Sequence, residues 1–310
     1  MRIIARPDFD GIVCAVLLHE ALDIDEPVLW VEPNVMQSGT VEVRKGDIIA
    51  NLSYHKNCTL WFDHHESNQM NIPFIGLFKI APSAAGNIFE FFNNFDPANY
   101  PEEISKHVRK FGRDYSKLVA AADKIDSAKL SLDEILHPEN YPCVSLSMTV
   151  ISYKQEDVPY WNHLVKLLRK YDIPKVIDDG EVKERCHAVI EESKKYKRLV
   201  KKHTVLKDHV SITDFRSFEK MPTGNRFLVF SLFPDAAVNV KIRYHNTDRN
   251  LVIVSVGHSI FNDNCNVSAG LLCSRYGGGG HRGAGSCSFS ADKAQENIDH
   301  IIEVLLKNEE

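Results

Sequence analysis

The chain has 310 residues, 44% of them hydrophobic, with a net charge of −5 and seven cysteines. The length and apolar content favour a globular protein of two domains, and the negative charge confines any basic binding surface to a local patch. The odd number of cysteines, without a CxxC pair, argues against both a disulfide framework and a structural zinc site.

Short β-rich runs alternate with helical patterns in the N-terminal part of the chain. Strands are predicted at 2–5, 28–31, 47–52, 58–62 and 74–80. A helix is expected from about Gly11 to Leu22, and Ser83 is a favourable N-cap for a second helix over 84–92. From Pro101 to about Ser152 the pattern is mainly helical. This alternation predicts an α/β domain built on a parallel sheet.

The C-terminal part begins with two predicted helices, at 158–172 and 181–203. β-rich runs follow at 209–215, 226–233, 237–245 and 251–258. They predict a smaller mixed-sheet α/β domain. We therefore expect domains at 1–190 and 206–310, joined by a helical linker over 191–205, where lysines and arginines cluster.

The chain offers no candidate membrane span, since no apolar run approaches the length of about 18 residues that a span needs. The N-terminal segment MRIIARPDFDG has acids where the apolar region of a signal peptide would continue. We expect a cytoplasmic protein that has no membrane partner.

Asp8 and Asp10 lie two residues apart just after the first predicted strand. In an extended segment this spacing sends both carboxylates to one side, where they repel each other unless a cation lies between them. Carboxylates and imidazoles suit Mn²⁺ and Mg²⁺. Capping of the helix that begins near Gly11 explains the same two residues equally well.

The stretch FDHHES places Asp63, His64 and His65 at the end of the predicted strand 58–62. The carboxyl ends of parallel strands face one crevice, where open α/β sheets bind ligands. We therefore expect Asp8, Asp10 and His64 to converge on a metal ion, which leaves the second histidine free to meet a substrate.

A fourth ligand is expected from the segment LVAAADKIDSA, which carries Asp123 and Asp126 one helical turn apart. Asp123 is the favoured ligand, and Asp126 is the alternative. Either carboxylate on its own is also consistent with a helix face exposed to solvent.

Four glycines precede His281 and Arg282 in the segment RYGGGGHRGAGSCSF. Bare backbone suits a close approach to a ligand or to another backbone, and the N–H groups of such a run are able to cradle a phosphate. The segment lacks the Lys-Ser/Thr ending of a P-loop. A flexible surface loop is the alternative interpretation.

Together, the motifs DFDG, FDHH and GGGGHRGAG resemble those of the DHH phosphoesterase family with its C-terminal DHHA1 domain. The resemblance spans nearly the whole chain. It implies hydrolysis of a phosphoester or phosphoanhydride at a manganese centre of one or two ions, with Mg²⁺ or Co²⁺ as alternatives. Family substrates include short RNAs, linear dinucleotides, phosphoadenosine phosphate and polyphosphate. A homodimer is a further expectation for this chain, whose oligomeric state the sequence does not determine.

The resemblance also implies roles for individual residues. The metal ligands would be Asp8, Asp10, His64 and Asp123. His65 would contact the phosphate and Asp63 would orient the histidines. Substrate would be held by Gly278, Gly279, Gly280, His281 and Arg282.

Three positions depart from the family pattern. Arg6 stands where the family has a metal-binding histidine, and Asn51 stands where it has a bridging aspartate. His258, next to Gly257, takes the place of an arginine that grips substrate. Because a guanidinium does not ligate metal, we hypothesise that Arg6 replaces the first ion and holds a phosphate oxygen.

The sequence thus predicts a metal-dependent phosphoesterase acting on a small nucleotide, a short oligonucleotide or polyphosphate. It favours neither nucleotides nor polyphosphate as substrate. The alternative is a regulatory protein that binds phosphate or nucleotide on the same fold after losing its catalytic ions.

Overall fold

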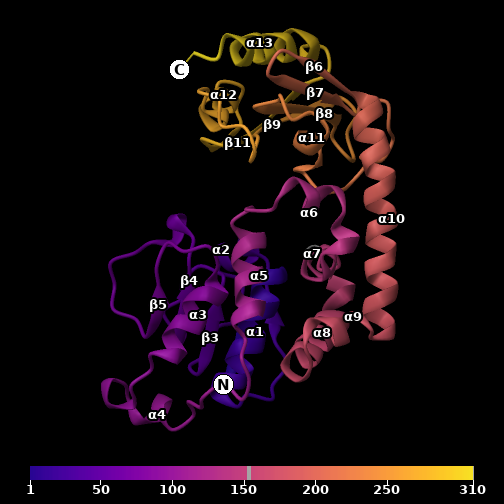
Figure 1. Cartoon of the computed structure of the whole chain (residues 1–310). Helices are drawn as coiled ribbons and strands as arrows, with labels where there is room; N and C mark the ends of the chain where they lie inside the picture. The colour runs from indigo at the N-terminus through magenta and orange to yellow at the C-terminus, as the bar shows by residue number, and fades with distance from the viewer. Residues whose placement is uncertain (152–154, 310) are drawn as a thin grey trace. The chain divides into compact units, whose positions relative to one another are not determined.

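The computed structural model describes residues 1–151 and 155–309 (Figure 1). The chain divides into two compact units, one made of Met1–Leu130 and Pro138–Val189, the other of Ser131–His137 and the residues from Ile190 onward. The division falls within a long helix, α10 (Gly180–His203), near the predicted linker. Ser152 and Glu310, predicted ends of a helical stretch and of a domain, lie outside the described residues.

The first unit is built on a parallel sheet with the strand order β2-β1-β3-β4-β5. Its strands are β1 (Arg2–Ala5), β2 (Leu29–Trp30), β3 (Asp47–Ala50), β4 (Leu60–Asp63) and β5 (Gly76–Phe78). Strands β3 and β4 are buried along their whole length, as expected for a parallel sheet covered on both faces. Open α/β sheets bind ligands at the carboxyl ends of the two strands where the strand order reverses, and in this sheet these strands are β1 and β3.

Helix α1 (Phe9–Leu22) lies at the centre of this unit and is buried except at Glu20. It shares one hydrophobic core with α3 (Ala84–Asn93), α5 (Ser116–Asp126) and α8 (Val158–Lys170). The shorter helices of the unit are α2 (Pro33–Gln37), α4 (Glu102–Ser105), α7 (Pro142–Met148) and α9 (Ile173–Ile177). Ser83 caps α3 as predicted, because its hydroxyl accepts a hydrogen bond from the Gly86 N–H at 2.9 Å.

The second unit contains a mixed sheet with the strand order β10-β11-β9-β8-β7-β6, in which only β7 and β8 pair in parallel. Its strands are β6 (Thr204–Lys207), β7 (Val210–Asp214), β8 (Val238–Tyr244), β9 (Leu251–His258), β10 (Gly279–His281) and β11 (Ala284–Ser290). Helices α12 (Ala269–Ser274) and α13 (Ala294–Lys307) share a core with one face of this sheet. The parallel sheet and the smaller mixed sheet confirm the predicted fold class.

The run at 226–233, predicted to be β-rich, forms helix α11 (Leu228–Leu232) instead. A short apolar run carries no period that separates a strand from a buried helix, so tertiary packing decides. Leu228, Val229 and Phe230 are buried, and α11 packs against α6 (Leu132–Leu136) of the same unit.

The glycine run forms an ordered hairpin rather than a flexible loop, because Gly279–His281 pairs with the start of β11. Gly270 of α12 and Gly285 of the hairpin are required by the close packing of the hairpin against α12. A Cβ on Gly270 of α12 would lie 2.5 Å from the carbonyl carbon of Gly280, and a Cβ on Gly285 would lie 2.4 Å from the carbonyl oxygen of Ala269. The hairpin backbone therefore rests directly on α12.

None of the helices in the described part of the chain is both long and apolar enough to cross a membrane. All seven cysteines are free thiols, and most of them are buried.

Candidate metal centre

Asp10 is a buried carboxylate held by the N-terminus of α3. Its side chain is 0% exposed, and its two oxygens accept hydrogen bonds from the backbone N–H groups of Ala84 and Ala85, each at 2.9 Å. The positive end of the helix dipole adds to this stabilisation of the negative charge. Burial and the nearby carboxylates of Asp126 and Asp8 nevertheless raise the pKa of Asp10 well above its usual value.

His64 follows β4 and presents one ring nitrogen to Asp10. Its Nδ1 lies 2.9 Å from the carbonyl oxygen of Ala81, which fixes Nδ1 as the donor and leaves a lone pair on Nε2. The buried Nε2 has no hydrogen-bond partner among the described residues. It lies 3.8 Å from Asp10 Oδ2 and 3.3 Å from Asp126 Oδ2.

The ligand atoms of Asp10, His64 and Asp126 all lie within 4.8 Å of one another. An ion with bonds of about 2.1 Å holds neighbouring octahedral ligands about 3.0 Å apart and opposite ones about 4.2 Å apart. The measured separations of 3.3 and 3.8 Å fall between these limits. Two carboxylates crowded around an unpartnered imidazole nitrogen therefore fit a divalent cation.

Asp123, the ligand favoured by the sequence, has a different partner. Its Oδ1 accepts a hydrogen bond from the Ser83 hydroxyl at 2.5 Å. A Cβ placed on Gly86 would lie 2.9 Å from the same oxygen, so α3 and α5 approach closely here. One turn further along α5, Asp126 reaches His64. The structure thus brings the alternative aspartate, rather than Asp123, to the ligand cluster.

Asp8 caps α1, and a cation already compensates its charge. Its Oδ1 accepts hydrogen bonds from the Gly11 N–H at 2.8 Å and from Asn51 Nδ2 at 3.0 Å, while its Oδ2 lies 2.9 Å from Arg6 Nε. Burial raises the pKa of Asp8, and Arg6 opposes that rise. Asp8 thus serves as the N-cap of α1 and as the ion-pair partner of Arg6, in addition to its predicted role as a metal ligand.

Asn51 lies directly after β3 in the left-handed backbone region, with φ of 58°. Its side chain is 1% exposed, and its Oδ1 has no hydrogen-bond partner in the described structure. The Asn51 amide therefore donates a hydrogen bond to Asp8 through Nδ2, and its uncharged Oδ1 remains as an acceptor.

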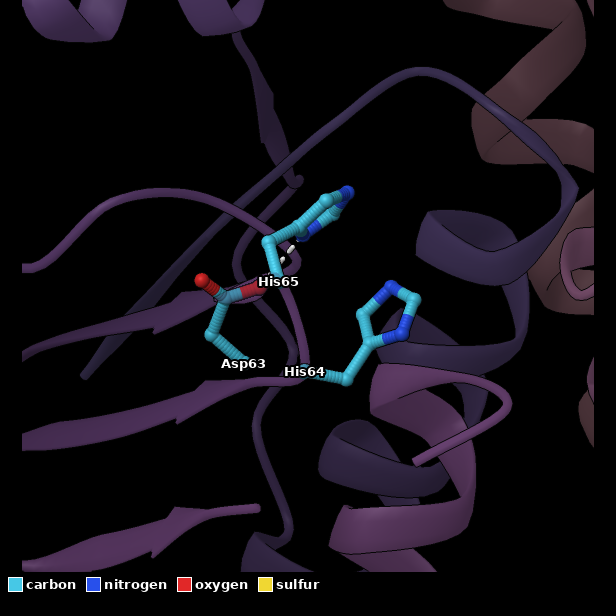
Figure 2. Close-up of side chains that lie close together, drawn as sticks. All are labelled: Asp63, His64 and His65. Carbon is cyan, nitrogen blue, oxygen red and sulfur yellow. Dashed lines mark hydrogen bonds and ion pairs between the residues drawn. The ribbon is translucent and has the colours of Figure 1, made fainter. Parts of the chain in front are cut away.

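His65 and Asp63 form a hydrogen-bonded pair beside His64. His65 Nδ1 lies 2.8 Å from Asp63 Oδ1, and Figure 2 shows this contact while His64 points away from Asp63. Asp63 is fully buried, and its other oxygen accepts from Asn68 Nδ2 at 2.6 Å. The hydrogen bond to Asp63 raises the pKa of His65, whose ring is 33% exposed.

The predicted substrate-binding residues belong to the second unit. Gly279, Gly280 and His281 form β10, Gly278 precedes it, and Arg282 lies in the turn of the hairpin. His258 ends β9 and its Nε2 lies 2.9 Å from the carbonyl oxygen of Val267. Burial lowers the pKa of His258, and the nearby Arg282 and His281 lower it further. These three basic side chains therefore gather at one end of the sheet.

Sequence reasoning missed the groups that hold the candidate site residues in place. These are the Ala81 carbonyl that orients His64, the Ala84 and Ala85 amides that hold Asp10, and Asn68, which holds Asp63. The predicted N-cap at Ser83 could have indicated the Ala84 and Ala85 amides, because the free N–H groups at a helix N-terminus attract a carboxylate. No comparable pattern marks Ala81 or Asn68.

A parallel sheet with Asp-His-His at its carboxyl edge and a mixed-sheet unit carrying the GGGGH hairpin are the arrangement expected from the resemblance to the DHH phosphoesterase family with its DHHA1 domain. Comparisons with solved structures confirm the resemblance that the motifs predicted. A scan against protein-family models and a search of curated protein sequences each found no match.

One similar structure is the pGpG-specific phosphodiesterase PggH from Vibrio cholerae, with a TM-score of 0.82 and 26% identity, covering 99% of each chain. An exopolyphosphatase-related protein from Bacteroides fragilis has a TM-score of 0.54 at 12% identity, covering 100% of this chain and 93% of its own. RecJ from Thermus thermophilus in complex with Mn²⁺ has a TM-score of 0.58 at 13% identity, and the match covers 99% of this chain and 52% of the RecJ chain. The last two share the fold.

Proposed function

We propose that this chain is a divalent-metal-dependent phosphodiesterase that cleaves a short linear dinucleotide such as pGpG. The observation that carries the proposal is the cluster of Asp10, His64 and Asp126, with the pair of Asp63 and His65 beside it. The likeness over 99% of both chains to a phosphodiesterase described as pGpG-specific favours a dinucleotide over polyphosphate.

Asp10, His64 and Asp126 are the residues that would hold the ion. Two carboxylates and one imidazole suit Mn²⁺, and Mg²⁺ and Co²⁺ are the alternatives to be assayed. A bound divalent ion supplies Lewis acidity that stabilises negative charge on the phosphate. The hydrogen bond from His64 to Ala81 fixes the ring orientation, as is usual for a metal-binding histidine.

His65 supplies positive charge and a proton. Because Asp63 raises its pKa, a larger fraction of His65 is protonated at neutral pH than for an isolated histidine. Asp63 engages Nδ1, which leaves the Nε2 N–H to donate to a phosphate oxygen or to protonate the leaving oxygen. Full burial of Asp63 and its bond to Asn68 keep the imidazole in one orientation.

Arg6 and Asn51 favour a centre with one ion. In a two-ion centre, the Asp8 carboxylate would be a ligand of the second cation. Here it forms an ion pair with Arg6 at 2.9 Å instead. The neutral Asn51 donates to Asp8 and adds no negative charge. Arg6 thus stands beside the centre as a fixed cation that is able to hold a phosphate oxygen.

The test is hydrolysis of pGpG by the purified chain with Mn²⁺, Mg²⁺ or Co²⁺, compared with short RNA, phosphoadenosine phosphate and polyphosphate. We expect pGpG to be cleaved with the highest kcat/KM, and a His64→Asn variant to lose both metal binding and activity. Binding of pGpG without turnover under every metal would instead support a regulatory protein on this fold.

A further inference from the structure

The first unit contains a cleft lined by lysines, between the start of α5 and the end of α8. Its volume is about 920 Å³, which lies within the range of about 300–1,000 Å³ that is typical of small-molecule sites. The buried side chains of Leu118 and Leu168 form part of its wall. Four cations and two acids also line this cavity, which we call the lysine cleft, and they are Arg113, Lys117, Lys170, Lys175, Asp114 and Asp172.

Both acids of the lysine cleft already have partners. The Asp114 carboxylate accepts hydrogen bonds from the Ser116 backbone N–H at 2.8 Å and from the Ser116 hydroxyl at 2.9 Å, and these bonds lower the pKa of Asp114. Asp172 forms an ion pair with Arg113. The three lysines of the cleft have no carboxylate partner among the described residues, so the cleft carries positive charge that the chain itself does not neutralise.

Two of these lysines lie over the ring of Tyr171, which follows α8 and also lines the cleft. Lys170 Nζ and Lys175 Nζ lie 5.1 and 4.2 Å from the centroid of the ring. Contact with Lys170 and the charges of both lysines lower the pKa of Tyr171. The cation–π contacts leave the ammonium N–H groups of these exposed lysines able to pair with an anion. Because like charges beside one ring repel each other, an anion bound there lowers the electrostatic energy.

A second cavity adjoins the lysine cleft, since Arg113 and Asp114 line both of them. Its volume is about 580 Å³. Phenylalanines form much of its lining, and we therefore call it the phenyl pocket; they are Phe89, Phe92, Phe95 and Phe111. The rings of Phe89 and Phe111 are stacked, with centroids 5.6 Å apart and planes inclined by 19°. Both side chains are only partly buried, so aromatic surface remains accessible to a flat ligand group.

The two cavities suit different parts of one nucleotide. Lysine and arginine side chains pair with phosphate oxygens, and a nucleobase stacks on aromatic rings. In a chain with a net charge of −5, an anion binds only where cations gather locally, as they do in the lysine cleft. Inorganic polyphosphate would contact the lysine cleft alone. Because the cavities adjoin at Arg113, a ligand that joins a flat ring system to a chain of phosphates fills both.

The lysine cleft is separate from the candidate metal centre, although both belong to the first unit. Lys117 lies in the first turn of α5, whereas Asp126 is the last residue of that helix. At a rise of about 1.5 Å per residue, these two positions are about 14 Å apart along the helix axis. None of the metal-cluster residues Asp10, His64 and Asp126 lines either cavity. A ligand in the cleft therefore does not compete with the metal ion for its ligands.

We propose that the lysine cleft and the phenyl pocket together form a second nucleotide site, which binds a nucleoside triphosphate. Its phosphates pair with Lys117, Lys170 and Lys175, and its base packs against the phenylalanines. This inference goes beyond the proposed phosphodiesterase function and does not depend on it, because the site lies within one unit and binding there needs no metal ion.

The experiment is titration calorimetry of the full chain with GTP and with ATP, without divalent metal. We expect the wild type to bind, and the double variant Lys170→Met with Lys175→Met to raise Kd by at least about tenfold, as loss of charged hydrogen-bond donors does. The matched control is Lys166→Met with Lys183→Met, which removes the same charge from two exposed lysines of α8 and α10 that do not line the cleft. Its Kd should be nearly that of the wild type.

Inorganic tripolyphosphate tests the phenyl pocket, because it lacks a base. It should bind more weakly than GTP, and Phe111→Leu should weaken GTP while leaving tripolyphosphate binding unchanged, which also shows that the variant is folded.

Three results would overturn the proposal. They are absence of nucleotide binding to the wild type, an unchanged Kd in the double lysine variant, and tripolyphosphate binding as tight as that of GTP. Asp126→Asn locates the bound nucleotide, since this variant should bind GTP with the wild-type Kd. An altered Kd there would assign the nucleotide to the metal centre and refute the second site.

Discussion

Asp123 and Asp126 lie one turn apart on α5, and replacing each with asparagine separates metal ligation from structural support. Asp126→Asn removes a carboxylate that lies 3.3 Å from His64 Nε2, the ring nitrogen without a hydrogen-bond partner among the described residues. Loss of a group that merely orients a metal ligand typically costs 10–100-fold in affinity, so loss of the ligand itself should cost at least about a hundredfold.

This loss translates into a measurable change in thermal stability. At an Mn²⁺ concentration of about 100 times the wild-type Kd, binding stabilises the protein by about 2.7 kcal/mol, and a hundredfold weaker site retains about 0.4 kcal/mol. For a unit of this size, these energies correspond to shifts in Tm of roughly 5–10 °C and about 1 °C. Without metal, Asp126→Asn should not be destabilised, because Asp126 raises the pKa of Asp10 by repulsion.

Asp123→Asn is the matched variant with the opposite pattern. Its amide oxygen still accepts from Ser83, but the bond loses its charge and about half its strength, or about 1 kcal/mol. We expect Tm to fall by about 2–4 °C without metal, with the full Mn²⁺-dependent shift retained. Differential scanning calorimetry with and without Mn²⁺, together with titration calorimetry of Mn²⁺, measures both effects. A normal metal shift in Asp126→Asn, or its loss in Asp123→Asn, would refute the ligand assignment.

Four further predictions concern the same site. His65→Ala should lower kcat by about 10²–10³-fold with Mn²⁺ affinity nearly unchanged, as loss of a charge-stabilising donor does; unaltered turnover in steady-state assays would exclude its role. Asp63→Asn should lower the pKa of His65, so the alkaline fall in kcat/KM, where His65 loses its proton, moves to lower pH, and an unmoved pH profile counts against the pairing. Asn51→Asp combined with Arg6→His should raise the Mn²⁺ stoichiometry from one to two by calorimetry, whereas two ions already present in the wild type would contradict the one-ion centre. Asn51→Asp alone should destabilise the metal-free chain, because it places a second carboxylate where Asn51 now donates to Asp8 at 3.0 Å, and urea unfolding measures this.

Local sequence signals determined the architecture of the first unit. Short apolar runs separated by helical patterns predict parallel strands, and parallel strands bring the residues that follow them to one edge. Asp10 after β1 and His64 after β4 are therefore predicted neighbours, and the structure places their side chains 3.8 Å apart. The N-cap at Ser83 was equally readable, because capping depends on residues three apart in the chain.

Tertiary packing alone decided the features that depend on how elements meet. The sequence places Asp123 and Asp126 on the same helix. The close approach of α5 to α3 at Gly86 lets Asp123 accept a hydrogen bond from Ser83 and directs Asp126 toward His64. The run at 226–233 became a helix because packing against α6 overrides the strand preference of its residues.

The alignment of Lys241, Ser255 and Ser286 on one face of the mixed sheet was also invisible in the sequence, because these residues become neighbours only through strand register. The sequence by itself determined which strand ends carry the acids and imidazoles, since a strand end is a local property. Which carboxylate joins Asp10 and His64 at the candidate metal centre depends on contacts between distant segments, and only the folded chain specifies it.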